Sequence, residues 1–137
     1  MQNSDDVEAV RAYGVGQAAE FGGIYFDGDT LVALFTHRPE WHLGELRPRL
    51  RRPFLFRTGE TDRTWAAVMA SNERVRHRLM DGSDFGAVHG VGITKVDGRF
   101  EIQVGVNPLD AEIERAIENA VKPDSVLIRG GGQSFSL

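Results

Sequence analysis

The sequence predicts an α+β protein, and three observations lead to this fold class. Residues 91–106 alternate apolar and polar side chains on both sides of a tight turn, which is typical of a hairpin buried on one face. The apolar residues from 109 to 121 then recur at helical spacing. The same order of elements occurs earlier in the chain. We therefore expect two repeated α-β-β-α-β modules with antiparallel hairpins, each sheet covered by helices on one face.

The first half begins with acidic residues after Ser4, which favour a helix N-terminus, and this helix is expected to reach about Tyr13. Residues 21–36 are predicted to form a hairpin. Its turn is either Asp27-Gly28 or Gly28-Asp29. Both faces of the hairpin are apolar, so the pattern leaves the register open.

A weaker helix is expected over residues 39–47, because Gly44 lowers helix propensity and Pro48 ends the pattern. Residues 54–56 are predicted to be a short strand. Thr61 can cap a longer helix that runs to Met80.

The second half repeats this order around the dipeptide Asp97-Gly98, which favours a two-residue turn. This turn places Ile93 opposite Ile102 and puts the apolar residues of both strands on one face. Asn107 is predicted to cap the following helix, with Pro108 as its first residue. A short strand over residues 125–128 completes the module.

The repeat is predicted to align Phe26-Asp27-Gly28 with Val96-Asp97-Gly98. On this alignment the modules occupy residues 1–59 and 60–137, and the second one ends in a flexible tail.

Composition excludes several classes of protein. The 137 residues carry a net charge of −4 and no cysteine, which excludes disulfides and thiolate metal sites and makes nucleic acid an unlikely default partner. No segment is apolar enough to span a membrane. The acidic start is unlike a signal peptide, so we expect a cytoplasmic protein, or a secreted one if an export signal has been removed.

One charged feature points to binding. Arginines crowd a single segment next to two phenylalanines, Phe54 and Phe56. This segment could bind nucleic acid through phosphate contacts and stacking, or its charges could be matched by the acidic helices of the same chain. The candidate binding arginines are Arg47, Arg49, Arg51, Arg52 and Arg57.

Candidate chemistry is weak by comparison. His37, Glu40, His42 and Glu45 lie within nine residues, but their spacing matches no zinc pattern, and a solvated helix end explains them. Ser134 and Ser136 have no adjacent base, so a serine nucleophile has no support there. We therefore expect no catalytic residue, no metal and no cofactor.

A family resemblance adds to these expectations. Phe21-Gly22-Gly23-Ile24-Tyr25-Phe26-Asp27, followed by residues 31–36, resembles the first hairpin in propeptides of secreted actinobacterial serine proteases of the streptogrisin and α-lytic type. The hairpin over 91–106, the helix after it and Gly130-Gly131-Gly132 are similar to the second module of those propeptides. The second half alone also resembles BON-type domains, which bind membranes or other proteins.

The resemblance implies a protein-binding function. Such propeptides clasp the folding protease as chaperones and place their C-terminal tail in its active site as an inhibitor. On this chain the tail would contribute Phe135 and Leu137. We expect a partner protein, either a serine protease or a toxin that the chain inhibits as an immunity protein, bound through a sheet face or edge by strand addition.

Overall fold

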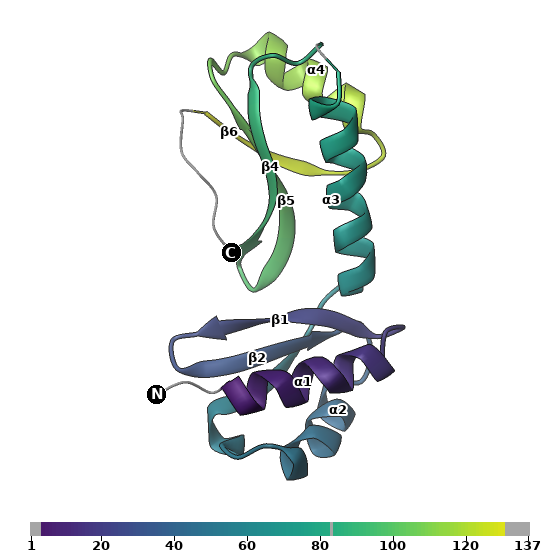
Figure 1. Cartoon of the computed structure of the whole chain (residues 1–137), viewed down its shortest axis with the longest axis vertical. Helices are drawn as coiled ribbons and strands as arrows, with labels where there is room; N and C mark the ends of the chain where they lie inside the picture. Colours follow the sequence, from purple (N-terminus) through teal and green to yellow (C-terminus); the bar gives the residue numbers. More distant parts are fainter. Residues whose placement is uncertain (1–3, 83, 131–137) are drawn as a thin grey trace. The chain divides into compact units, whose positions relative to one another are not determined.

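The computed structural model describes residues 4–82 and 84–130 of the chain. This part of the protein is α+β, with four α-helices and two three-stranded sheets (Figure 1), so the predicted fold class is confirmed. The chain divides into two compact units, Met1–Ala66 and Ala67–Leu137.

The first unit contains one mixed sheet. Strands β1 and β2 form an antiparallel hairpin, whereas β3 runs parallel to β2 because α2 carries the chain back across the sheet. The elements of this unit are α1 (Ser4–Gly16), β1 (Phe21–Asp27), β2 (Thr30–Phe35), α2 (Pro39–Leu46), the 3₁₀ turns η1 (Arg47–Arg49) and η2 (Pro53–Leu55), and β3 (Phe56–Glu60).

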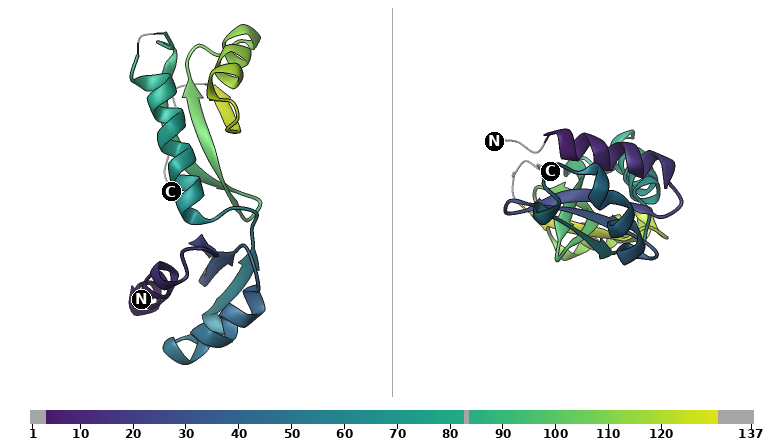
Figure 2. Two further views of the ribbon diagram at one scale, coloured as in Figure 1. Left: turned by 90° about the vertical axis from the view of Figure 1, so that its right-hand side faces the viewer. Right: turned by 90° about the horizontal axis from the view of Figure 1, so that it is seen from below.

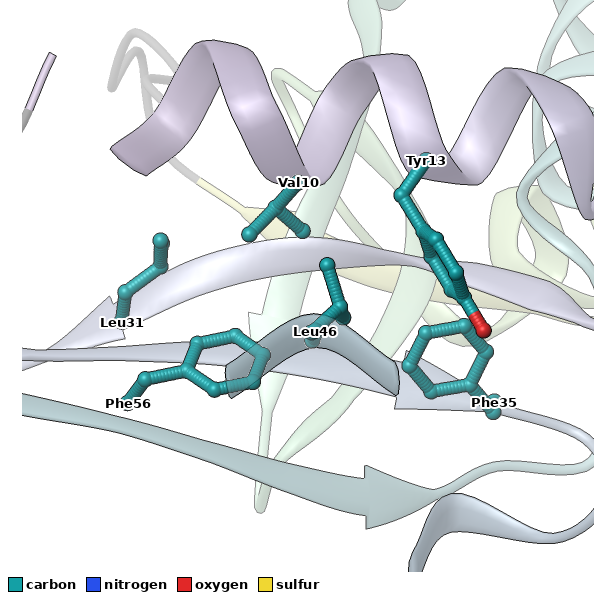
Figure 3. Close-up of a cluster of buried hydrophobic side chains, with 7 residues drawn as sticks. Val10, Tyr13, Leu31, Phe35, Leu46 and Phe56 are labelled. Atoms are coloured by element: carbon teal, nitrogen blue, oxygen red, sulfur yellow. The ribbon is translucent and has the colours of Figure 1, made fainter. Parts of the chain in front are cut away.

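The core of the first unit lies between this sheet and its two helices. Alternate residues of β2 share one face, and α1 and α2 pack against that face (Figure 1, Figure 2). Figure 3 shows the side chains from the helices and the strands converging on one cluster. Its buried members are Val10, Tyr13, Leu31, Ala33, Phe35, Leu46 and Phe56.

The structure fixes the register of the first hairpin, which the sequence left open. Asp27 pairs with Thr30, so Gly28-Asp29 is the turn. Gly28 has a φ of 60°, which glycine adopts without strain. Residues 54–56 are not a strand: Phe54 belongs to η2, and β3 begins only at Phe56.

The second unit repeats the arrangement. Its strands β4 and β5 are antiparallel and β6 is parallel to β5. Figure 1 shows both of its helices on one side of the sheet. The elements are α3 (Trp65–Met80), which begins at the border of the units, β4 (Val88–Val96), β5 (Arg99–Val106), α4 (Ala111–Val121) and β6 (Val126–Gly130).

The predicted register of the second hairpin is confirmed. Ile93 pairs with Ile102, and both central residues of the turn, Asp97 and Gly98, have positive φ. The predicted helix start was wrong. Asp110, not Asn107, is the N-cap of α4, because its carboxylate accepts a hydrogen bond of 2.8 Å from the backbone N–H of Ile113.

The two sheets match row by row. In each unit, five consecutive residues of the central strand pair in parallel with the third strand, from Leu31 to Phe35 and from Ile102 to Val106. Each hairpin also has a register shift at the start of its first strand, after Phe21 and after Val88. The chain therefore contains two versions of one fold.

The matched residues of the central strands correct the predicted alignment of the hairpins. Phe26 pairs with Leu31, as Ile93 pairs with Ile102, so Phe26 corresponds to Ile93 and not to Val96. The second hairpin is longer by two pairs of residues beyond this point. The two turns are therefore not equivalent positions.

A second difference between the units lies before the third strand. Nine residues, 47–55, separate α2 from β3, whereas four residues, 122–125, separate α4 from β6. The five additional residues of the first unit fall within the arginine-rich segment.

The helices correspond as well. In the second helix of each unit, the buried residues are the last one and the one four positions before it: His42 and Leu46 in α2, Ile117 and Val121 in α4. Counted from the end of the helix, His42 corresponds to Ile117 of the second unit. No helix in the described ranges has the length and apolar character needed to cross a membrane.

Candidate binding surface on the first unit

The arginine-rich segment is held by a buried carboxylate. Asp6 of α1 is 5% exposed, and its two oxygens accept hydrogen bonds from the backbone N–H groups of Arg51 (2.8 Å) and Arg52 (3.0 Å). These bonds satisfy two main-chain donors in a segment without regular pairing. Residues 47–52, which we call the arginine segment, are therefore anchored to α1 by their backbone.

Some of the predicted arginines have partners within the unit. Arg51 Nη1 lies 3.3 Å from the carboxylate of Asp5, and Arg57 Nη2 lies 2.9 Å from that of Asp27. The bond to Asp27 also raises the pKa of Arg57. The guanidinium of Arg49 lies 5.1 Å from the centre of the Tyr13 ring. Thus part of the expected neutralisation by acidic groups of the chain is present.

Arg47 and Arg52 differ from these three. Their side chains are exposed, and no carboxylate of the described residues forms an ion pair with them. Two residues beyond Arg52, Phe54 is 79% exposed in η2. Phe56, the second expected stacking residue, is buried in the core instead. The arginine segment therefore presents two unneutralised arginines, and the exposed ring of Phe54 follows it in η2.

A second polar feature begins in the core. The hydroxyl of Tyr13 lies 2.6 Å from Nδ1 of His42, and Nε2 of His42 lies 2.8 Å from Oε1 of Glu20. His42 is fully buried, and its ring stacks on Phe35 at 3.9 Å between centres. With neutral His42, the tyrosine donates to Nδ1 and Nε2–H donates to Glu20, so every polar atom of the ring is satisfied.

This chain of hydrogen bonds continues to the surface. Arg38 donates to Glu20 from Nη2 (3.0 Å) and from Nε (3.4 Å), and its guanidinium lies 4.3 Å from the centre of the Trp41 ring. Hydrogen bonds from His42 and from Arg38 lower the pKa of Glu20. We call the connected side chains the histidine relay; they are Tyr13, His42, Glu20, Arg38 and Trp41.

The relay uses His42, one of the four residues that the sequence analysis considered and rejected as zinc ligands. Both ring nitrogens of His42 are occupied, and His37 Nδ1 lies 3.0 Å from the hydroxyl of Thr36. We expected a solvated helix end, and for His42 this was wrong. Its side chain is fully buried and contacts the rings of Tyr13 in α1 and Phe35 in β2. The described residues contain no group of three or more ligands placed to hold a metal.

The order Tyr13, His42, Glu20 has the form of a nucleophile, a base and an orienting carboxylate. Two observations favour a structural role. The tyrosine is buried, and this burial raises the pKa of its hydroxyl, whereas an activated nucleophile needs the opposite shift.

The second unit has simpler polar contacts at the corresponding places. The buried Ser71 of α3 donates a hydrogen bond to Asp124, in the link before β6. In the first unit, Asp6 of α1 accepts a hydrogen bond from the link before β3. In both units, therefore, the first helix is bonded to the link that precedes the third strand. Arg74 also donates to Asp124, at 2.8 and 3.0 Å. Arg78 donates to the carbonyl of Ala120. These contacts join α3 to α4 and its link, and none involves a histidine.

The predicted site residues are thus distributed unevenly. The arginine segment groups Arg47, Arg49, Arg51 and Arg52, while Arg57 lies on β3 beside Asp27. Phe135 and Leu137 lie outside the described residues. The sequence reasoning missed the histidine relay, because Tyr13 and Glu20 are 29 and 22 positions from His42 and no local pattern connects them. No protein-family model and no curated protein matches the chain.

Proposed function

We propose that the chain is a non-enzymatic protein-binding module that binds its partner through the arginine segment and Phe54. The observation that carries this proposal is the buried Asp6, which fixes the backbone of the segment beside a phenylalanine that is 79% exposed. Arginine and aromatic residues dominate the energetics of protein interfaces, and a fixed backbone reduces the entropy lost on binding.

The charges define the kind of partner. Arg47 and Arg52 need carboxylates, and Phe54 needs an apolar pocket, so the partner is a protein with an acidic surface around such a pocket. An inhibitor or chaperone of a serine protease, or an immunity protein for a toxin, is the form of this function that the family resemblance suggests.

Binding to single-stranded nucleic acid is the second candidate. The position of Phe54 between Arg52 and Arg57 suits a base stacked between phosphate contacts. It ranks lower because Arg51 and Arg57 already pair with carboxylates, which leaves few free charges for phosphates.

The proposal is tested with Phe54→Ala. The tagged protein is incubated with a lysate of the source organism, and retained proteins are quantified by mass spectrometry. We expect a protein that the wild type retains and that Phe54→Ala loses, and a calorimetric titration with that purified protein should show affinity reduced about tenfold or more. Val15→Ala is the matched control, since Val15 is 81% exposed in the same unit.

Two results would contradict protein binding at this surface. One is that Phe54→Ala and Val15→Ala retain the same proteins in the same amounts. The other is that a fluorescent oligothymidylate binds the wild type, loses affinity with Phe54→Ala, and shows a steep salt dependence, which would establish the nucleic-acid reading instead.

A further inference from the structure

The histidine relay places a polar side chain in the core of the first unit. In α4, the second helix of the second unit, both buried residues, Ile117 and Val121, are apolar, so this fold does not need a buried polar residue in that helix. A buried polar group stabilises less than an apolar one unless all its hydrogen bonds are made. His42 makes both, to Tyr13 and to Glu20. Where a core residue departs from the simpler alternative, a role beyond folding is the usual reason.

The surface end of the relay is held in an unusual conformation. Arg38 has φ 53° and ψ 51°, a left-handed backbone that is strained for a residue with a Cβ. Its side chain is fixed by two hydrogen bonds to Glu20 and by the Trp41 ring. Strain maintained by surrounding contacts is common at binding sites.

The two residues at this end remain accessible. The side chain of Arg38 is 51% exposed and Trp41 is 45% exposed. Glu20 neutralises the charge of Arg38 and accepts its Nε hydrogen and one of its Nη2 hydrogens, which leaves the second Nη2 hydrogen and both Nη1 hydrogens to donate. This pair therefore suits an uncharged partner segment with an apolar side chain and a carbonyl acceptor, unlike the carboxylates that Arg47 and Arg52 require.

We propose that Arg38 and Trp41 form a second contact site for the partner protein, and that His42 and Glu20 are positioning residues that hold this pair ready. The inference rests on the proposed function. Pro39 follows the Phe35 end of β2, while Phe54 precedes Phe56, which pairs with Leu31. These ends are about 13 Å apart along the strands, a separation that one interface of standard size spans.

The positioning role has a readout that does not need the partner. In a Trp65→Phe background Trp41 is the only tryptophan, so its emission reports its contacts with Arg38 and with the ring of His42, whose centre lies 5.1 Å away. Only a variant that leaves His42 in place, such as Glu20→Ala, therefore reports the contact with Arg38 by itself. The double variant His42→Ile/Tyr13→Phe introduces an apolar residue of the type buried in α4 and leaves no unpaired hydroxyl. We expect it to unfold near the wild-type denaturant midpoint but to shift the Trp41 emission. Glu20→Ala, at a partly exposed loop position, should give the same shift with all apolar core side chains in place. It leaves Nε2–H of His42 without its acceptor, so its denaturant midpoint is measured alongside.

Binding is then measured with lysate proteins captured in parallel on the wild type and the variants, followed by titration of the purified partner. Trp41→Ala should weaken binding about tenfold. Glu20→Ala and the double variant should each weaken it severalfold. Met69→Ala, at a side chain that is 49% exposed in the second unit, should bind like the wild type.

The outcomes separate the two proposals. If Phe54→Ala loses the partner while Trp41→Ala binds normally, this inference is wrong and the proposed function stands. If Trp41→Ala loses the partner while Phe54→Ala binds normally, the arginine segment is not the site and the second contact is. If both variants bind like the wild type, both proposals fail. If Glu20→Ala leaves the Trp41 emission unchanged, the positioning role is excluded.

Discussion

Asp6 shows how one side chain can organise a segment 45 residues away. Its two carboxylate oxygens replace the regular pairing that the backbone of Arg51 and Arg52 lacks. The neighbouring Asp5 makes a contact of a different kind, because it pairs with the exposed side chain of Arg51. The two adjacent aspartates therefore allow a direct comparison between a buried and an exposed interaction.

We predict that Asp6→Ala lowers the free energy of unfolding by about 1–3 kcal/mol, because two buried N–H groups lose their acceptor. Asp5→Ala should change it by less than about 0.5 kcal/mol, since exposed ion pairs contribute little. Urea denaturation of both variants measures the difference. Equal effects of the two substitutions would show that Asp6 does not anchor the segment.

Glu20 gives a prediction on pH. Its pKa in the folded protein lies below the ordinary value of 4.5, because His42 and Arg38 donate to its carboxylate. A lowered pKa means that the ionised group stabilises the folded state above pH 4.5, and that this contribution is lost as the pH falls through the folded pKa. Chemical denaturation from pH 6 to 3 should show this loss.

Glu20→Gln should flatten the pH dependence in that window, whereas Glu40→Gln, at an exposed position of α2, should leave it as in the wild type. A carboxyl resonance of Glu20 that titrates at or above 4.5 by NMR is the result that rules this out.

At the scale of elements, turn chemistry shows what the sequence could and could not predict. Asp97-Gly98 fixed one register because only one face of that hairpin is apolar, and the structure has the predicted pairs. Around Gly28 both faces are apolar, since every residue of β2 from Leu31 to Phe35 is buried. The local sequence pattern therefore could not distinguish the two possible turns, Asp27-Gly28 and Gly28-Asp29.

Two glycines of the first unit provide an opposing pair of substitutions. Gly28→Ala should destabilise by about 1 kcal/mol, because its φ of 60° strains any residue with a Cβ. Gly44→Ala should stabilise by about 0.5–1 kcal/mol, because Gly44 is exposed inside α2 and an added Cβ meets no atom within 4 Å. Thermal unfolding measures both, and changes of the same sign would contradict the assigned backbone conformations.

The helix boundaries and the relay were beyond sequence reasoning for two different reasons. Asn107 and Asp110 are both capable caps, and only the fold shows that the carboxylate of Asp110 reaches the N–H of Ile113. His42 was expected to face solvent because its partners come from other elements, Tyr13 from α1 and Glu20 from the loop before β1. Long-range polar contacts leave no periodic signal in a sequence.

At the scale of the whole molecule, each sheet has one strand that pairs on both sides, β2 in the first unit and β5 in the second. We predict that the amides of these central strands exchange hydrogen most slowly within their own unit, because their opening breaks two ladders and exposes buried side chains. Hydrogen exchange followed by mass spectrometry or NMR tests this. Faster exchange in β2 than in β1 or β3 would contradict the strand order.

The row-by-row match between the two sheets has a practical consequence for all of these experiments. A residue in one half has a counterpart in the other that experiences the same temperature, buffer and concentration within the same molecule. His42 and Ile117, or the long and short links, can thus be exchanged between the halves. In each such exchange, the unchanged half of the same molecule serves as the control.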